Sequence, residues 1–196
     1  MSAASSATEP FLVSSSPEDH ELLQAVGRGE QAALGELFER YHLSVYRFLA
    51  RLSGTDARDL DDLVQNTFLE VQRAASGYGG RASVRTWLFG VAANVARHHV
   101  RSEMRRRSML ASVDQPGVSE GRPPERAAES RELLGRLAQA LDALPHDLRV
   151  AFIACELEEL PGAEVAHALG IREGTLWRRL HDARKALLCK LEGSSP

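Results

Sequence analysis

The residues whose spacing most clearly indicates a chemical role are the basic ones near the C-terminus. In the segment 170–188, GIREGTLWRRLHDARKALL, Gly170 begins a turn and the following residues have the spacing of an amphipathic helix. A guanidinium group can donate paired hydrogen bonds to guanine or hold a backbone phosphate. Arg178 and Arg179 therefore indicate non-covalent recognition of nucleic acid.

No group of residues has the spacing of a catalytic or metal site. The candidates for nucleophiles or metal ligands are His98, His99, His181, Cys155 and Glu156, and they match no pattern of either kind. Cys155 and Cys189 are 34 residues apart, with no CxxC motif, so two reduced thiols are expected. The sequence thus predicts a protein that is not an enzyme and holds neither a metal nor another cofactor.

The residues on both sides of Gly170 predict two helices that pack together across a tight turn. Packing contacts are expected from Val165, Ala166, Leu169, Ile171, Leu176 and Leu180. The second helix has an apolar stripe at 4-3-4 spacing, formed by Leu176, Leu180, Ala183 and Leu187. Its opposite face presents Arg178, His181, Asp182 and Lys185, with Trp177 and Arg184 on one flank. This pattern is typical of a helix-turn-helix, whose second helix enters the major groove. The alternative is an ordinary helical hairpin with a solvated basic face.

A second candidate surface is acidic and lies in the segment 59–68, DLDDLVQNTF. Helical spacing gives this segment a buried stripe of Ala57, Leu60, Val64, Phe68 and Val71. The opposite side carries Asp59, Asp62, Asn66, Leu69 and Arg73. Leu69 is an apolar residue in the middle of this polar face, which favours a protein-binding surface with a basic or mixed partner. The alternative is a single exposed leucine of no functional meaning.

A third candidate surface joins a glycine-rich loop at 78–83 to the helix expected after it. In that helix Trp87, Leu88, Val91 and Val95 have the spacing of core residues. Asn94, Arg97 and Arg101 share a flank, where the arginines could hold phosphates and Asn94 could recognise a base. The loop with Tyr78 could hold an unstacked base of a single strand. The alternative is a solvated, charged helix end.

Helical periodicity dominates the chain, and no segment alternates as a strand would. Helices are expected at 17–26, 31–52, 56–75, 83–106, 146–158, 162–169 and 173–191, with a further leucine-rich helix that ends at Pro145. Residues 1–16 are expected to form a disordered tail, and the proline- and glycine-rich residues 108–128 a flexible linker. The predicted fold is therefore all-α, with two small helical domains at 17–107 and 129–193, the second containing the helix-turn-helix.

The charge is distributed in blocks along a chain of 196 residues whose net charge is −3. The net charge is −4 over residues 53–70, +6 over 81–107 and +4 over 172–190. Such a chain can bind nucleic acid at some faces and protein at others. No run of 18 apolar residues and no secretory signal is present, so a cytoplasmic protein without membrane insertion is expected.

From about residue 19 to 191 the chain resembles bacterial RNA polymerase sigma factors of the extracytoplasmic-function (ECF) group. DLDDLVQNTFLEV resembles the family's motif for binding core polymerase. GGRASVRTWLFGVAANVARHHVR resembles the stretch that melts and recognises the −10 element. LDALPHDLRVAF and GTLWRRLHDAR resemble the fourth region, which recognises the −35 element.

The resemblance implies a transcription initiation factor whose partners are core RNA polymerase, promoter DNA and an anti-sigma factor. It implies core-polymerase contacts by Asp59, Asp62, Leu63, Gln65, Asn66 and Leu69. It implies recognition and melting of the −10 element by Tyr78, Arg81, Ser83, Thr86, Trp87, Asn94, Arg97 and Arg101. It implies recognition of the −35 element by Thr175, Trp177, Arg178, Arg179, His181, Asp182 and Lys185.

Some positions depart from the family pattern. Trp177 and Asp182 stand where the family usually or often has basic residues, which bears on the −35 sequence that the chain prefers. Pro161 and Arg172 stand where a serine or threonine often caps a helix, a cap worth about 1 kcal/mol. Glu159 stands where the family often has glycine.

Two other functions remain open at this level. A dimeric helix-turn-helix regulator would account for residues 146–191, although it would leave the acidic helix and the Tyr78 loop without a role. A degenerate sigma-like protein would occupy polymerase and recognise DNA poorly, which Trp177 and Asp182 would explain.

Overall fold

The computed structural model describes residues 17–53, 57–109 and 135–192. Every element in these ranges is a helix, so the all-α prediction is confirmed. The tail predicted at 1–16 lies outside the described residues. The linker predicted at 108–128 also lies outside them, apart from its first two residues, which end a helix. None of the described helices is both long and apolar enough to cross a membrane.

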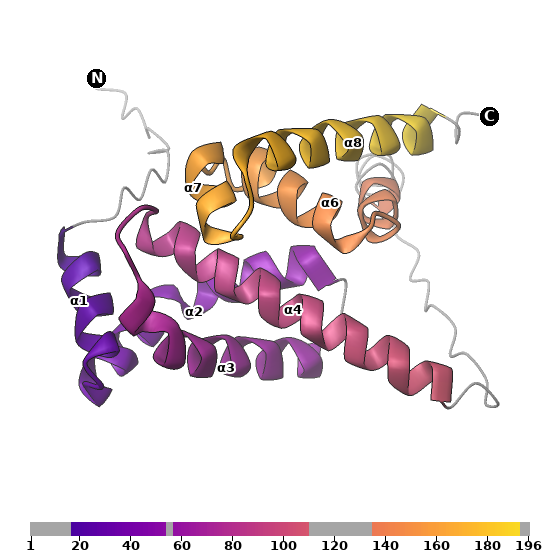
Figure 1. Ribbon diagram of the computed structural model, residues 1–196. Coiled ribbons are helices and arrows are strands. Elements are labelled where there is room, and N and C mark those ends of the chain that lie inside the picture. The colour runs from indigo at the N-terminus through magenta and orange to yellow at the C-terminus, as the bar shows by residue number, and fades with distance from the viewer. Residues whose placement is uncertain (1–16, 54–56, 110–134, 193–196) are drawn as a thin grey trace, which may run out of the picture.

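The N-terminal half of the chain forms a four-helix unit in which α2, α3 and α4 pack around a leucine-rich core (Figure 1). Its elements are α1 (Pro17–Gly27), α2 (Gln31–Ser53), α3 (Ala57–Ala74), the short 3₁₀ helix η1 (Ala75–Gly77) and α4 (Val84–Met109). The largest side chains fully buried in it include Phe48, Leu49, Leu63 and Leu88. Burial of these side chains is the main term that stabilises the unit.

The C-terminal half is built from shorter helices. Residues 135–142 are helical, and they are followed by α6 (His146–Phe152), the π-helical turn η2 (Ile153–Leu157), α7 (Gly162–Ala168) and α8 (Glu173–Glu192). The helix predicted at 146–158 therefore ends in a π turn, which widens the last part of the helix. Between α7 and α8, Gly170 has φ +65°, and the Ile171 N–H donates to the Ala166 carbonyl at 2.9 Å. This is the glycine-capped turn that the sequence predicted.

The turn that leads into α7 contains the departure at Glu159. Glu159 has φ +52°, and it is the residue other than glycine that adopts positive φ within the described ranges. A side chain in this left-handed region costs about 1 kcal/mol or more, which glycine avoids. The backbone of the turn therefore favours glycine at this position.

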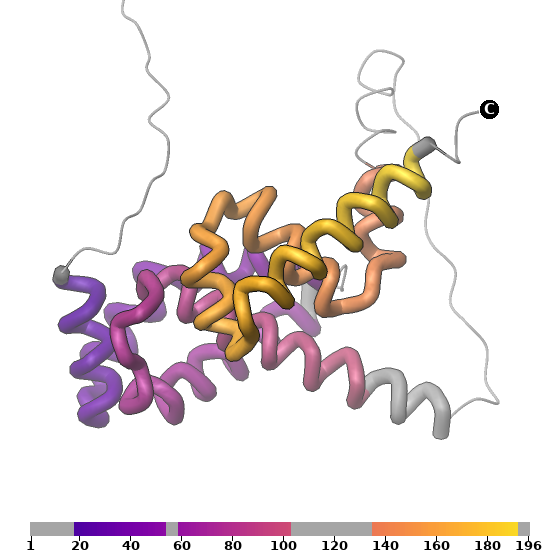
Figure 2. Tube along the Cα trace, turned by 45° about the horizontal axis from the view of Figure 1, so that its top comes forward, coloured from indigo at the N-terminus to yellow at the C-terminus, as the bar shows by residue number. Residues whose placement is uncertain are grey.

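The two halves of the chain pack against each other, which the sequence did not indicate. Phe48 and Phe89 of the first half belong to the same buried cluster as Val150, Ile153 and Val165 of the second. Figures 1 and 2 show α7 lying across the first part of α4 from two directions. A Cβ atom on Gly90 of α4 would lie 2.7 Å from the Ala168 carbonyl oxygen of α7. Only a residue without a side chain permits this approach.

Candidate nucleic-acid and partner interfaces

Helix α8 presents the predicted recognition face to solvent. Its apolar stripe is buried as predicted, with exposed fractions of 4% or less for Leu176, Leu180, Ala183 and Leu187. On the other side Arg178, His181, Asp182 and Lys185 are exposed, and Thr175 is half-buried. In Figure 1 this helix lies along the outer side of the second half, away from α2 and α3. The geometry therefore leaves its polar face accessible to a large ligand.

The indole of Trp177 is held in place although half of it is exposed. Its exposed fraction is 50%. Its inner part lies so close to α7 that a Cβ atom on Gly162 would come within 2.6 Å of the indole Cζ2 atom. Gly162 thus makes the room in which the ring lies, and the exposed part of the ring is an apolar surface beside Arg178. Such a surface suits contact with the methyl group of thymine.

Arg179 differs from its neighbour Arg178 because it is already engaged within the chain. Its guanidinium donates to Asp147 Oδ2 of α6 at 2.7 Å. Asp147 Oδ1 lies 3.5 Å from the guanidinium of Arg97 on α4. The carboxylate of Asp147 therefore links one predicted −35 residue to one predicted −10 residue. Neither arginine can bind a phosphate fully while this link holds.

The exposed face of α3 contains most of the residues predicted to bind polymerase. Asp59, Asp62, Gln65, Asn66 and Leu69 are exposed, and the exposed fraction of Leu69 is 51%. Leu63, also predicted there, is only 1% exposed and belongs to the core. Its side chain therefore mainly positions the helix, and what remains accessible lines the groove between α3 and α4.

A groove of about 740 Å³ runs between α3 and α4. Asn66 and Leu69 line it from α3, and Asn94, His98 and His99 line it from α4. The structure thus brings Asn94, predicted to recognise DNA, next to Leu69, predicted to bind a protein. The sequence assigned these residues to separate surfaces because 25 positions separate them.

Tyr78 forms a hydrogen bond across the glycine-rich loop in which it lies. Its hydroxyl donates to the Ala82 carbonyl at 2.7 Å and lies 3.3 Å from His20 Nδ1 of α1. Its ring packs edge-on against Trp87, with centroids 5.5 Å apart. Burial, followed by the charges of Glu164 and Asp19, raises the pKa of Tyr78 to about 12. Tyr78 and Trp87 thus give the loop its shape, and Arg81 is the charged loop residue, exposed to solvent beside Gly79 and Gly80.

Ser83 and Thr86, both predicted to contact the −10 element, are covered by the second half of the chain. Glu164 of α7 accepts the Ser83 N–H at 2.7 Å and the Thr86 hydroxyl at 3.0 Å through the same Oε2 atom. Thr86 is 1% exposed. The Ser83 hydroxyl also caps α4 by accepting the Thr86 N–H at 3.1 Å. DNA cannot reach these groups unless α7 moves away.

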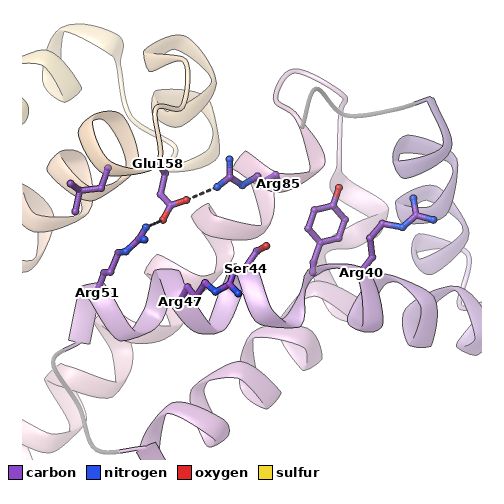
Figure 3. A pocket seen from close by; sticks show the side chains of 8 residues that line it. Arg40, Ser44, Arg47, Arg51, Arg85 and Glu158 are labelled. Carbon is purple, nitrogen blue, oxygen red and sulfur yellow. Dashed lines mark hydrogen bonds and ion pairs between the residues drawn. The ribbon is translucent and has the colours of Figure 1, made fainter. Parts of the chain in front are cut away.

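Sequence patterns did not point to Glu158, which accepts from two arginines of the other half of the chain. Its carboxylate accepts from Arg51 of α2 and, at 2.5 Å, from Arg85 of α4 (Figure 3). The side chain of Glu158 is 7% exposed. The partners lie 107 and 73 positions earlier in the chain, so no local spacing could have revealed them. Arg101, the last predicted −10 residue, is exposed on α4.

His146 of α6 lies at the same boundary and should make it sensitive to acid. Its Nε2 atom is 3.1 Å from the Ala93 carbonyl of α4. Burial lowers the pKa of His146, and the hydrogen bond to Ala93 opposes this effect. Arg97 and Arg149 also lower the pKa, whereas Asp147 raises it. The neutral ring is therefore the form that suits the closed boundary.

We expect the folded chain to lose stability as the pH falls below the ordinary histidine value of 6.5. Below that value the unfolded chain takes up a proton before the folded chain does, and the loss continues down to the lowered pKa of the folded state. Urea unfolding at pH values from about 8 to about 5 measures the effect. His146→Gln keeps an N–H donor and does not titrate, so its stability should depend less on pH. Equal pH dependence of both proteins would contradict the assignment.

Comparison with known proteins matches both halves of the chain to the same protein family. The family model for sigma-70 region 2 matches residues 37–106, and the one for sigma-70, region 4 matches residues 134–187. The ECF RNA polymerase sigma factor SigE of Mycolicibacterium smegmatis is 34% identical over 163 residues, which cover 81% of this chain and 63% of SigE. The ECF RNA polymerase sigma-E factor of Escherichia coli K12 is 29% identical over 182 residues, or 89% of this chain and 94% of that protein.

Two solved structures have a similar fold. CnrH in complex with the cytosolic domain of CnrY has a TM-score of 0.62 and 26% identity, over 90% of this chain and 99% of that chain. The sigma factor RpoE of Bartonella quintana, solved with the anti-sigma factor NepR, has a TM-score of 0.62 and 20% identity, over 82% and 98% of the two chains. The second likeness concerns the fold alone.

Proposed function

Since the chain belongs to the sigma-70 family, within its ECF group, we propose that it binds core RNA polymerase and directs promoter-specific initiation of transcription. The observation that carries the proposal is that each of the two regions matched by the family models presents one exposed surface of the expected charge. The leucine-bearing acidic face of α3 lies in region 2, and the basic outer face of α8 lies in region 4.

The roles divide between these surfaces. The exposed residues of α3, with Leu69 at the centre, bind core polymerase. The exposed face of α8 recognises the −35 element in the major groove. The loop at 78–83 and the first turns of α4 bind and melt the −10 element. Because region 2 and region 4 belong to one chain, binding of one raises the effective concentration of the other at the promoter.

The protein acts as a subunit in this proposal and has no catalytic role of its own. Polymerase supplies the chemistry, and the chain works in the cytoplasm beside it. An anti-sigma factor is a further proposed partner. The Bartonella RpoE was solved in complex with the anti-sigma factor NepR, and CnrH was solved in complex with the cytosolic domain of CnrY. Such a partner would compete for the faces that polymerase or DNA needs.

Run-off transcription tests the proposal. Purified core polymerase is incubated with promoter fragments from the source genome, with and without this protein. Start sites that occur only when the protein is added establish a sigma factor. Binding to core without initiation would instead favour the degenerate sigma-like protein, and duplex binding alone would favour an ordinary regulator.

Replacing Leu69 with arginine should weaken binding to core polymerase about tenfold or more. Leu69 is the exposed apolar residue at the centre of the acidic face, where a buried contact in the complex contributes most. The change lies on the surface, so the unfolding free energy should stay nearly unchanged. Fluorescence anisotropy of labelled protein titrated with core polymerase measures the affinity.

Leu43→Arg is the matched control, because Leu43 is an equally exposed leucine, at 55%, on another helix of the same unit. Its affinity for core polymerase should stay close to that of the parent protein. If both variants bind core as the parent does, the polymerase surface does not include Leu69.

A further inference from the structure

A basic pocket lies at the boundary between the two halves of the chain (Figure 3). Its volume is about 450 Å³, and it is lined by arginines of α2 and α4 and by the turn after η2. The charged residues that line it are Arg40, Arg47, Arg51, Arg85 and Glu158. None of the arginines belongs to the set that the sequence pointed to, so the pocket has no role in the function proposed so far.

Positive charge is in excess in this pocket. Arg40 is neutralised outside it, because its guanidinium donates to Asp19 at 2.5 Å and to Glu36 at 2.7 Å. Arg51 and Arg85 share one carboxylate, that of Glu158. Among the residues that the structure describes, Arg47 pairs with no carboxylate. A pocket with unpaired guanidinium groups attracts an anion.

The single carboxylate of the pocket comes from the other half of the chain. Glu158 follows η2, whereas Arg47 and Arg51 are one helical turn apart on α2 and Arg85 precedes Thr86 on α4. If region 4 moves away, Arg51 and Arg85 lose the carboxylate that they share, and Arg47 already lies beside them without one. They are then left on one face of region 2, next to the Ser83 and Thr86 groups that Glu164 releases at the same time.

We propose that Arg47, Arg51 and Arg85 bind the phosphate backbone of the single strand at the −10 element, and that Glu158 occupies this site while the chain is closed. The proposal rests on the proposed function. A carboxylate and a phosphate offer similar pairs of oxygens to a guanidinium group, so one replaces the other. Glu164 does the same to the Ser83 N–H and the Thr86 hydroxyl. Closure of the chain and binding of the strand therefore exclude each other.

The salt dependence of strand binding is the measurement that tests the proposal. The full chain is titrated onto a fluorescein-labelled oligothymidylate of about twelve nucleotides at several salt concentrations. Each phosphate contact contributes roughly 0.7 to the slope of log K against log salt for a single strand. Glu158→Gln should tighten binding several-fold and make the slope steeper. Arg47→Gln, which leaves the Glu158 contacts in place, should weaken binding and reduce the slope.

Matched variants distinguish the effect of losing a carboxylate from the effect of separating the two halves of the chain. Glu156→Gln removes a carboxylate from the same turn whose partner, Arg184, lies within region 4, so strand binding should not change. Gly90→Ala places a Cβ atom against Ala168 and pushes α7 from α4 with no change in charge. It should increase the radius of gyration measured by X-ray scattering and tighten strand binding as Glu158→Gln does. In the Glu158→Gln background, adding Arg51→Gln and Arg85→Gln should cancel the gain.

Equal affinities and slopes for the parent, Glu158→Gln and Arg47→Gln would overturn the proposal. It would also be overturned if Gly90→Ala expands the chain without tighter strand binding, or if tripolyphosphate binds saturably while the strand does not. Run-off transcription by the same preparations keeps the two proposals apart. Normal initiation with unchanged slopes overturns only the phosphate site, whereas no initiation by the parent protein overturns the proposed function itself.

Discussion

Replacing Phe48 with alanine is expected to lower the free energy of unfolding by about 4 kcal/mol. Phe48 is 1% exposed, and its ring stacks on Phe89 with centroids 4.4 Å apart and an angle of 11° between the planes. It also lines the contact between α4 and the second half, next to Val150 and Val165. Alanine would leave a cavity in the core of region 2 and at the boundary between the halves.

Urea unfolding followed by far-UV circular dichroism measures this loss. Phe38→Ala is the control, because Phe38 is only partly buried, against His42 and Phe68. Its loss should be about half that of Phe48→Ala, since the cost of truncation grows with the cavity left behind. Equal losses for the two variants would show that Phe48 is not the centre of the packing between the halves.

Replacing Arg149 with alanine is expected to cost about 3 kcal/mol, because it leaves several carbonyl oxygens without a donor. The guanidinium donates to the Leu52 carbonyl at 2.7 Å, to the Asp142 carbonyl at 2.5 Å and to the Leu144 carbonyl at 3.1 Å. Its side chain is 13% exposed. Burial lowers the pKa of Arg149, with Asp142 opposing this effect. Arg149 thus fixes the end of α2 to the loop before α6.

The same unfolding experiment measures this effect, and Arg184→Ala is its control. Arg184 pairs with Glu156 at the surface of region 4, with 55% of its side chain exposed, and exposed ion pairs contribute about 1 kcal/mol or less. Arg149→Lys should recover only part of the stability, since an ammonium group cannot reach carbonyls in so many directions. A loss for Arg149→Ala no larger than that for Arg184→Ala would contradict the role assigned to these bonds.

Most helices could be predicted because their signals are local. The 4-3-4 stripe of α8 depends on residues within three turns, and every member of the stripe is buried. Gly170 by itself predicts the turn between α7 and α8, because only glycine adopts positive φ at little energetic cost. The π turn η2 was missed, since its residues continue the apolar pattern of α6 and nothing local signals the change of hydrogen-bond pattern.

The arrangement of the candidate site could not be predicted to the same extent. Helical spacing correctly placed Leu69 outside, whereas Leu63, assigned to the polymerase surface only from the family resemblance, is buried in the core. The engagement of Arg179 by Asp147 and that of Arg51 by Glu158 depend on how the halves pack. Packing of this kind is decided by surfaces far apart in the sequence. Which residues contact DNA or polymerase stays a prediction.

The contact between Gly162 and Trp177 has a consequence for how the outer face of α8 can change over generations. With tryptophan at 177, a methyl group at 162 would lie 2.6 Å from the ring, so the ring would have to shift to admit it. A basic residue at 177 would remove the ring and make position 162 permissive. Substitutions here are therefore epistatic: the cost of a side chain at 162 depends on whether position 177 carries tryptophan.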